Sequence, residues 1–119
     1  MSETPLRHDG VIMEASTVQF AEMARSLARE ARRLGLRAPS FRCPPRLVGI
    51  DRTLRRSAGG SVTVAVRVRG RPWPAVVVDM IEGIVMANEL RSPDADRART
   101  ALWVIASSAG GLDVAARVA

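Results

Sequence analysis

The chain of 119 residues is 47% hydrophobic, which suits one globular domain with a buried core rather than a disordered chain. Its formal net charge is +6, all 18 basic residues are arginines, and its only Phe, Trp or Tyr residues are two phenylalanines and two tryptophans, which argues against a single-strand reader that stacks bases on aromatic rings. The single cysteine excludes an internal disulfide, and no apolar run approaches the roughly 18 residues that a membrane-spanning helix needs.

The first predicted element is an amphipathic helix over residues 17–34, after a flexible tail over 1–14. Ser16 and Gln19 have the spacing of a capping box, and Gly35 is placed to terminate the helix. Arginines fall on the side opposite the apolar residues, so the helix is expected to pack on the domain and expose a basic face. The predicted apolar stripe consists of Phe20, Ala24, Leu27, Ala31 and Leu34.

A proline-rich linker follows at 37–49, because its three prolines forbid helix and favour extended backbone. We expect Phe41 to attach this arm to the body of the domain. A short strand is predicted near 50–56, and the turn after it contains two adjacent glycines. The clearest strand is 61–69, in which buried valines alternate with residues of the wet face. These valines are Val62, Val64, Val66 and Val68.

The segment 73–80 is predicted as a second apolar strand, so the tetrapeptide Arg-Gly-Arg-Pro at 69–72 is interpreted as a hairpin tip. The same tetrapeptide forms the core of the AT-hook, which lies in the minor groove of A·T-rich DNA. Hooks lie in flexible polar segments, whereas this one is flanked by apolar stretches. Asp79 and Glu82 then predict the cap of a short, buried helix over 80–90.

The last predicted helix begins at Ser92, with Pro93 in its first turn and acidic residues near its positive end. Its apolar residues are Ala98, Ala101, Leu102 and Ile105, and Gly110-Gly111 ends it. The predicted fold class is therefore α+β: an N-terminal amphipathic helix, a proline-rich arm, a two- to three-stranded antiparallel sheet and two C-terminal helices. We expect one domain over 15–108 and a flexible tail over 109–119.

The positive charge is concentrated in the middle of the chain. Residues 25–71 hold 13 arginines against Glu30 and Asp51, whereas residues 1–24 and 72–119 sum to −3 and −2. This tract predicts a surface for a polyanion or an acidic partner, and the alternative is a solvated basic face without a ligand. The candidate contacts to nucleic acid are Arg29, Arg32, Arg33, Arg52, Arg55, Arg56, Arg67, Arg69 and Arg71.

Some of these arginines are expected to be paired. On the first helix, carboxylates three residues before arginines predict surface ion pairs of Glu22 with Arg25 and of Glu30 with Arg33. Asp51, the one acid of the strand region, is expected to pair with a nearby arginine.

Few residues suggest chemistry. Asp79 and Glu82 are one helical turn apart, as a catalytic carboxylate pair would be, but ordinary helix capping explains the same spacing. Cys43 lies between arginines that favour a thiolate, so a redox role is the alternative to an incidental small residue. One histidine, His8, and one cysteine cannot build a four-ligand structural zinc site. We therefore expect no enzyme, no cofactor and no metal.

Two families share part of the predicted element order. A helix, three strands and a helix resemble the double-stranded-RNA-binding domain, but the helix after the sheet begins with acidic and apolar residues instead of a basic cluster. Residues 73–106, read as a strand and two helices, resemble the ribbon-helix-helix repressors, in which a polar strand enters the major groove. The segment 73–80 is too apolar for that role, so neither resemblance assigns a family.

Two functions remain. The first is a small, non-enzymatic regulatory protein that binds nucleic acid through its arginine-rich surface, mainly by phosphate contacts. The second is a homodimeric protein-interaction or regulatory subunit, joined through residues 80–106, whose arginine-rich face docks an acidic protein. The lone cysteine and the lack of a signal-peptide pattern at the N-terminus predict a cytoplasmic location.

Overall fold

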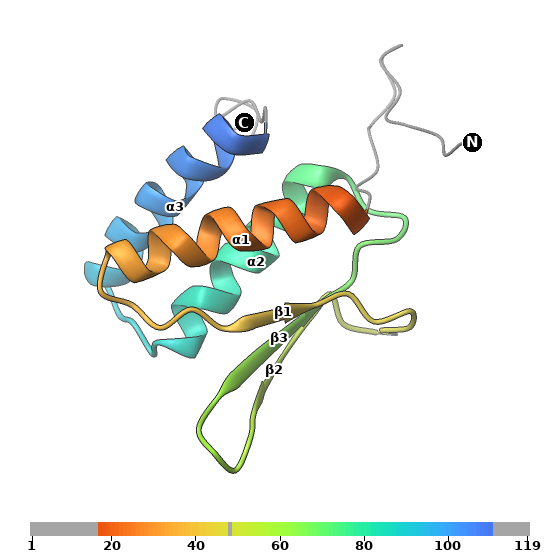
Figure 1. Ribbon diagram of the computed structural model, residues 1–119, viewed down its shortest axis with the longest axis horizontal. Helices are drawn as coiled ribbons and strands as arrows, with labels where there is room; N and C mark the ends of the chain where they lie inside the picture. Colours follow the sequence, from red (N-terminus) through yellow and green to blue (C-terminus); the bar gives the residue numbers. More distant parts are fainter. Residues whose placement is uncertain (1–16, 48, 111–119) are drawn as a thin grey trace.

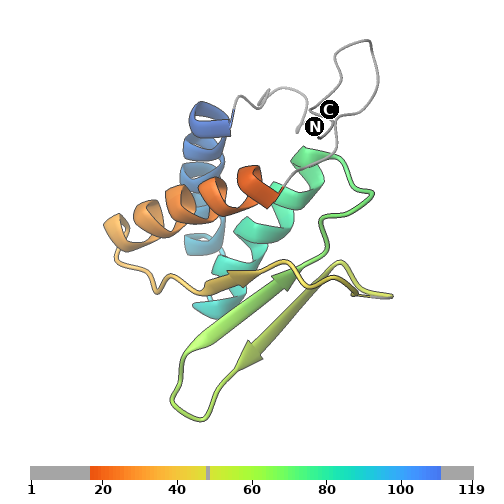
Figure 2. The same ribbon diagram turned by 45° about the vertical axis from the view of Figure 1, so that its right-hand side comes forward.

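The computed structural model describes residues 17–47 and 49–110, and the predicted α+β class is confirmed (Figure 1). The helices lie together on one side of a three-stranded sheet, and the β2–β3 hairpin extends beyond them (Figure 2). No described helix is both long and apolar enough to cross a bilayer. The elements in chain order are α1 (Thr17–Arg33), β1 (Ser40–Arg42), β2 (Arg52–Arg56), β3 (Val62–Val66), α2 (Trp73–Ala87) and α3 (Asp94–Gly110).

α1 ends where the sequence predicts. Gly35 adopts a positive φ of 81°, which glycine tolerates better than other residues. The Leu36 amide donates to the Ala31 carbonyl at 2.8 Å, and the Gly35 amide donates to the Arg32 carbonyl at 3.0 Å, which together form a Schellman motif. Met23 joins Phe20, Leu27 and Ala31 in the core, whereas Leu34 of the predicted stripe is exposed because it lies beyond the end of α1. The predicted cap at residue 16 lies outside the described residues, as do the predicted tail 1–14 and residues 111–119.

The sheet is mixed rather than purely antiparallel, and its strand order is β1-β3-β2. β2 pairs with β3 in antiparallel orientation, with Leu54 opposite Val64, as expected for a hairpin. β1 comes from the arm that was predicted only as a linker, and it pairs with β3 in parallel, with Phe41 opposite Val64. Prolines flank this short strand, so its pairing is brief. Phe41 attaches the arm to α1, since its ring meets Phe20 edge-on at 6.5 Å.

Residues 73–80 are helical, so the prediction of a second strand there is wrong. α2 begins with Pro72 as its N-cap and Pro74 in its first turn, where a missing amide costs no intrahelical bond. The valine run suited either structure, because α2 is buried on almost all sides and no polar face reveals its helical period. Asp79 therefore lies within the helix and does not cap it. The resemblance to ribbon-helix-helix repressors, which required a strand here, fails.

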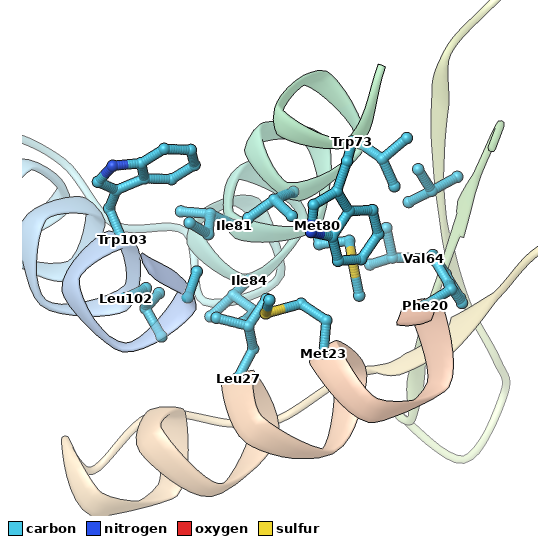
Figure 3. Close-up of a cluster of buried hydrophobic side chains, with 14 of the residues drawn as sticks. Phe20, Met23, Leu27, Val64, Trp73, Met80, Ile81, Ile84, Leu102 and Trp103 are labelled. Carbon is cyan, nitrogen blue, oxygen red and sulfur yellow. The ribbon is translucent and has the colours of Figure 1, made fainter. Parts of the chain in front are cut away.

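Gly83 allows α2 to lie close to β3. A Cβ atom added at Gly83 would lie 2.6 Å from Cγ1 of Val64, a side chain that is completely buried. Around this contact the three helices and the sheet contribute to one core (Figure 3). Its members include Phe20, Met23, Leu27, Val64, Trp73, Met80, Ile84, Leu102 and Trp103.

α3 begins close to the predicted residue. The Arg97 amide donates to the Pro93 carbonyl at 3.1 Å, and the Ser92 hydroxyl donates to the Asp96 carboxylate at 2.7 Å. Leu102 is buried as predicted, together with Trp103, which the predicted stripe omitted. α3 packs against both α1 and α2, so the two C-terminal helices complete the helical layer.

Candidate functional site

The described acidic side chains are almost all engaged by arginines. The exception is Glu22, which makes no ion pair with a described residue, so its predicted pair with Arg25 does not form. The ion pairs within the described residues use Arg33, Arg52, Arg56, Arg67, Arg71, Arg97 and Arg99. The arginines without a carboxylate partner among the described residues are Arg25, Arg29, Arg32, Arg37, Arg42, Arg46, Arg55, Arg69 and Arg91.

Three of these arginines lie on the outward side of α1. We call Arg25, Arg29 and Arg32 the α1 stripe; all three are exposed. Their spacing of four and three residues places them on one side of the helix, over about 10 Å of its axis. Arg29 also borders a groove of about 510 Å³ between α1 and α3. The α1 stripe is therefore a row of exposed arginines on one helix, and their guanidinium groups are free to meet an external anion.

Arg33, the neighbour of the α1 stripe, is paired as predicted. Its Nε donates to Oε1 of Glu30 at 2.9 Å. This hydrogen bond holds the pKa of the Glu30 carboxyl below its ordinary value, against the opposing effect of desolvation. Glu30 is itself buried, so the pair anchors Arg33 against the body of α1. Arg33 is less available to a ligand than the α1 stripe.

The face of the sheet that points away from the helices carries a second set of free arginines. Residues directly opposite each other in a sheet point to the same face. The register therefore places Arg42 with Ala65 and Thr53, and Arg55 with Thr63, on the face opposite buried Val64. Arg42 and Arg55 are exposed, and neither has a carboxylate partner in the described part of the chain.

Where β3 leads into α2, a group of charges is paired internally. We call Asp51, Arg52, Arg67, Arg71 and Asp79 the turn network. Arg71 Nη1 lies 2.7 Å from Asp79 Oδ2, and the Arg71 and Asp79 side chains are only 10% and 15% exposed. Arg71 also donates to the Arg67 carbonyl at 2.9 Å. Arg52 approaches Asp79 at 3.5 Å, so one carboxylate of α2 receives arginines from the β3–α2 turn and from β2.

The outer part of the turn network is more exposed. Arg67 donates to Oδ1 of Asp51 through Nε at 3.0 Å and Nη2 at 2.7 Å, which confirms the expected pairing of Asp51. The hydrogen bond from Arg67 is the main cause that lowers the pKa of the Asp51 carboxyl. These contacts join the start of β2 to the end of β3, so the turn network fastens two strands and a helix together.

The Arg-Gly-Arg-Pro tetrapeptide is an ordered connection from strand to helix and not a hairpin tip. Gly70 adopts a φ of 76°, and the Arg71 amide donates to the Val68 carbonyl at 3.2 Å. Arg71 turns inward and Arg69 stays exposed. An AT-hook needs both arginines free to enter a groove, and this turn offers only one.

The predicted candidates thus separate into two groups. Arg29, Arg32, Arg55 and Arg69 are exposed and without a carboxylate partner among the described residues. The others are paired: Arg33 with Glu30, Arg52 and Arg71 with Asp79, Arg67 with Asp51, and Arg56 with Glu89 at 3.5 Å. Arg25 lies on the side of the first helix opposite its apolar residues, so the sequence already indicated that it is exposed. In all, the sequence prediction left out five free arginines. These are Arg25, Arg37, Arg42, Arg46 and Arg91.

The residues considered for catalysis have structural partners. Asp79 belongs to the turn network, and Glu82 accepts from Nε of Arg99 on α3 at 2.6 Å. Burial raises the pKa of the Cys43 thiol, which disfavours the reactive thiolate rather than promoting it. His8 lies outside the described residues. Within 17–47 and 49–110, no three His, Cys, Asp or Glu side chains are grouped as metal ligands.

Comparisons with protein-family models, with curated protein sequences and with solved structures find no match to this chain.

Proposed function

We propose that this chain is a non-enzymatic nucleic-acid-binding module that holds the phosphate backbone through its free arginines. The observation that carries the proposal is the division of charge in the folded chain. Nearly all described carboxylates form ion pairs with arginines of the same chain. The guanidinium groups that have no such partner face outward, foremost those of the α1 stripe. A planar guanidinium group matches phosphate in two-pronged geometry, and it stays charged at every physiological pH.

The alternative is a homodimeric subunit joined through residues 80–106. The observation that suggested this alternative has another explanation in the structure. That prediction rested on a helix that is apolar on nearly all sides. Most apolar side chains of α2 are buried within this single chain, among them Val77, Met80, Ile81 and Ile84, and Met86 is the exposed exception. Burial in the domain accounts for the pattern without a second copy. Dimerisation remains a prediction for light scattering to test.

The test is a fluorescence-anisotropy titration of labelled DNA and RNA at about 50 mM salt, where phosphate contacts are strong. We expect saturable binding that weakens steeply as salt is added. The stripe variant, Arg25→Gln/Arg29→Gln, is expected to bind about tenfold more weakly than the unaltered protein. Glutamine keeps the helix propensity close to that of arginine, so the fold of α1 is preserved.

The matched control is Arg56→Gln/Arg97→Gln, which removes the same charge from two exposed arginines that are paired with Glu89 and Asp94. If both variants lose the same affinity, net charge rather than the α1 stripe governs binding. If the unaltered protein binds neither DNA nor RNA at about 50 mM salt, the proposed function fails, and an acidic protein becomes the partner to seek.

A further inference from the structure

The aromatic side chains of this chain all pack in or against its core. The sequence contains two phenylalanines, two tryptophans and no tyrosine. Phe20, Trp73 and Trp103 are each only 5% exposed, and Phe41 is half-buried with its ring against Phe20. Figure 3 shows the two indole rings and the Phe20 ring pointing into the cluster formed by the helices and β3. None of these rings is a surface platform for a base.

Stacking on aromatic side chains is the main way in which proteins hold single strands. Each stacked base contributes favourable free energy, which offsets the cost of ordering a flexible strand. A surface that offers guanidinium groups without aromatic rings gains chiefly from phosphates. A duplex presents one negative charge per about 1.7 Å of axis, twice the density of one strand, and its phosphates are already ordered.

The α1 stripe suits such a preformed ligand. Three guanidinium groups project from one side of a helix, over an axial length of about 10 Å that is comparable to the width of the major groove of B-DNA, about 12 Å. α1 is held by the Schellman motif at its end and by its packing against α3, so the backbone positions of the three arginines are fixed. Fixed attachment points favour a polyanion whose phosphates are already ordered, because only the arginine side chains must then be ordered on binding.

We propose that the ligand of this module is double-stranded nucleic acid, bound through its backbone without opening of the base pairs. The inference rests on the proposed function and specifies which form of nucleic acid the arginines select. Specificity for base sequence is not part of it, because phosphate contacts carry no sequence information directly.

The experiment compares one sequence of about 20 nucleotides as a single strand and as a duplex, in DNA and in RNA, with the full chain at about 100 mM salt. We expect at least about tenfold tighter binding to the duplex than to its component strands, for DNA, for RNA or for both. The duplex that binds more tightly, DNA or RNA, is then the form of nucleic acid that this module selects. The stripe variant should lose affinity for that duplex, whereas Arg56→Gln/Arg97→Gln should not.

Equal or tighter binding to single strands would overturn the inference while leaving the proposed function intact. Absence of binding to every probe would overturn the proposed function itself. Tryptophan emission gives a second readout, because a base stacked on Trp73 or Trp103 would quench it. We expect the emission to stay unchanged on saturation with duplex, and strong quenching would contradict the buried position of both rings.

Discussion

The turn between β3 and α2 and the outward side of α1 both carry several arginines. The two sets differ in whether the fold places a carboxylate beside them. At the turn, Arg71 is 8% exposed and is neutralised by Asp79, a carboxylate from the helix that follows. On α1, Arg25 and Arg29 are exposed and form no ion pair with a described carboxylate. Positive charge in a sequence therefore has two fates: it is neutralised within the fold where tertiary packing supplies an acid, and it stays available to an external anion where packing does not.

The largest expected effect comes from breaking the turn network. Asp79→Ala leaves Arg71 buried beside an empty position, so we expect the free energy of unfolding to fall by about 2–4 kcal/mol. Urea denaturation followed by circular dichroism measures it. The control Asp94→Ala removes a carboxylate from an exposed pair with Arg97 in the first turn of α3 and should cost under about 1 kcal/mol. Equal effects of the two variants would show that burial does not distinguish them.

A smaller loss is expected from the contact that seats α2 on the sheet. Gly83→Ala places a methyl group against Val64, and overpacking of this kind costs about 1–3 kcal/mol, partly offset by the better helix propensity of alanine. Adding Val64→Ala makes room, so the double variant should lose less stability than the two separate losses combined. Strict additivity would show that the two residues do not press on one another.

Acid should act on the turn network through Asp51. Its pKa is lowered from an ordinary value of 3.8, chiefly by the hydrogen bond from Arg67, so the unfolded chain takes up this proton before the folded one. The stability that the pair contributes is complete above about pH 4 and is lost as the pH falls through the lowered value. Thermal melts between about pH 5 and pH 3 should show a shallower decline for Asp51→Asn than for the unaltered chain. Parallel declines would contradict this role of Asp51.

The smallest effect on stability is expected on α1. The stripe variant removes no ion pair, and surface substitutions of this kind change the free energy of unfolding by under about 0.5 kcal/mol. Urea denaturation should therefore give the unaltered midpoint, while affinity for duplex falls. A large loss of stability would mean that the α1 stripe has a structural role like that of the turn network.

Much of the fold follows from local patterns in the sequence. The helix ending at Gly35, the alternating valines of β3 and the last helix are specified by residues close to one another in the chain. α2 was mistaken for a strand because a helix buried on every side shows no amphipathic period. β1 was missed because its partner β3 lies more than twenty residues further along, and three residues give no pattern.

The division of the arginines was predictable only within one helix. The pair of Arg33 with Glu30 follows from their spacing, since both lie on one turn of α1. The pairing of Arg52 and Arg71 with Asp79 required α2 to fold back along the sheet, which the sequence did not reveal. Arg71 consequently ranked beside Arg29 as a ligand contact, although only Arg29 remains free at the surface.

The most direct test of the central claim is the salt dependence of duplex binding. The slope of log Kd against log salt changes by about 0.9 for each phosphate contact on B-DNA. Removing Arg25 and Arg29 in the stripe variant should make the slope shallower by about 1.8, whereas Arg56→Gln/Arg97→Gln should leave it unchanged. An unchanged slope for the stripe variant would contradict the claim that the free arginines of α1 hold the phosphate backbone.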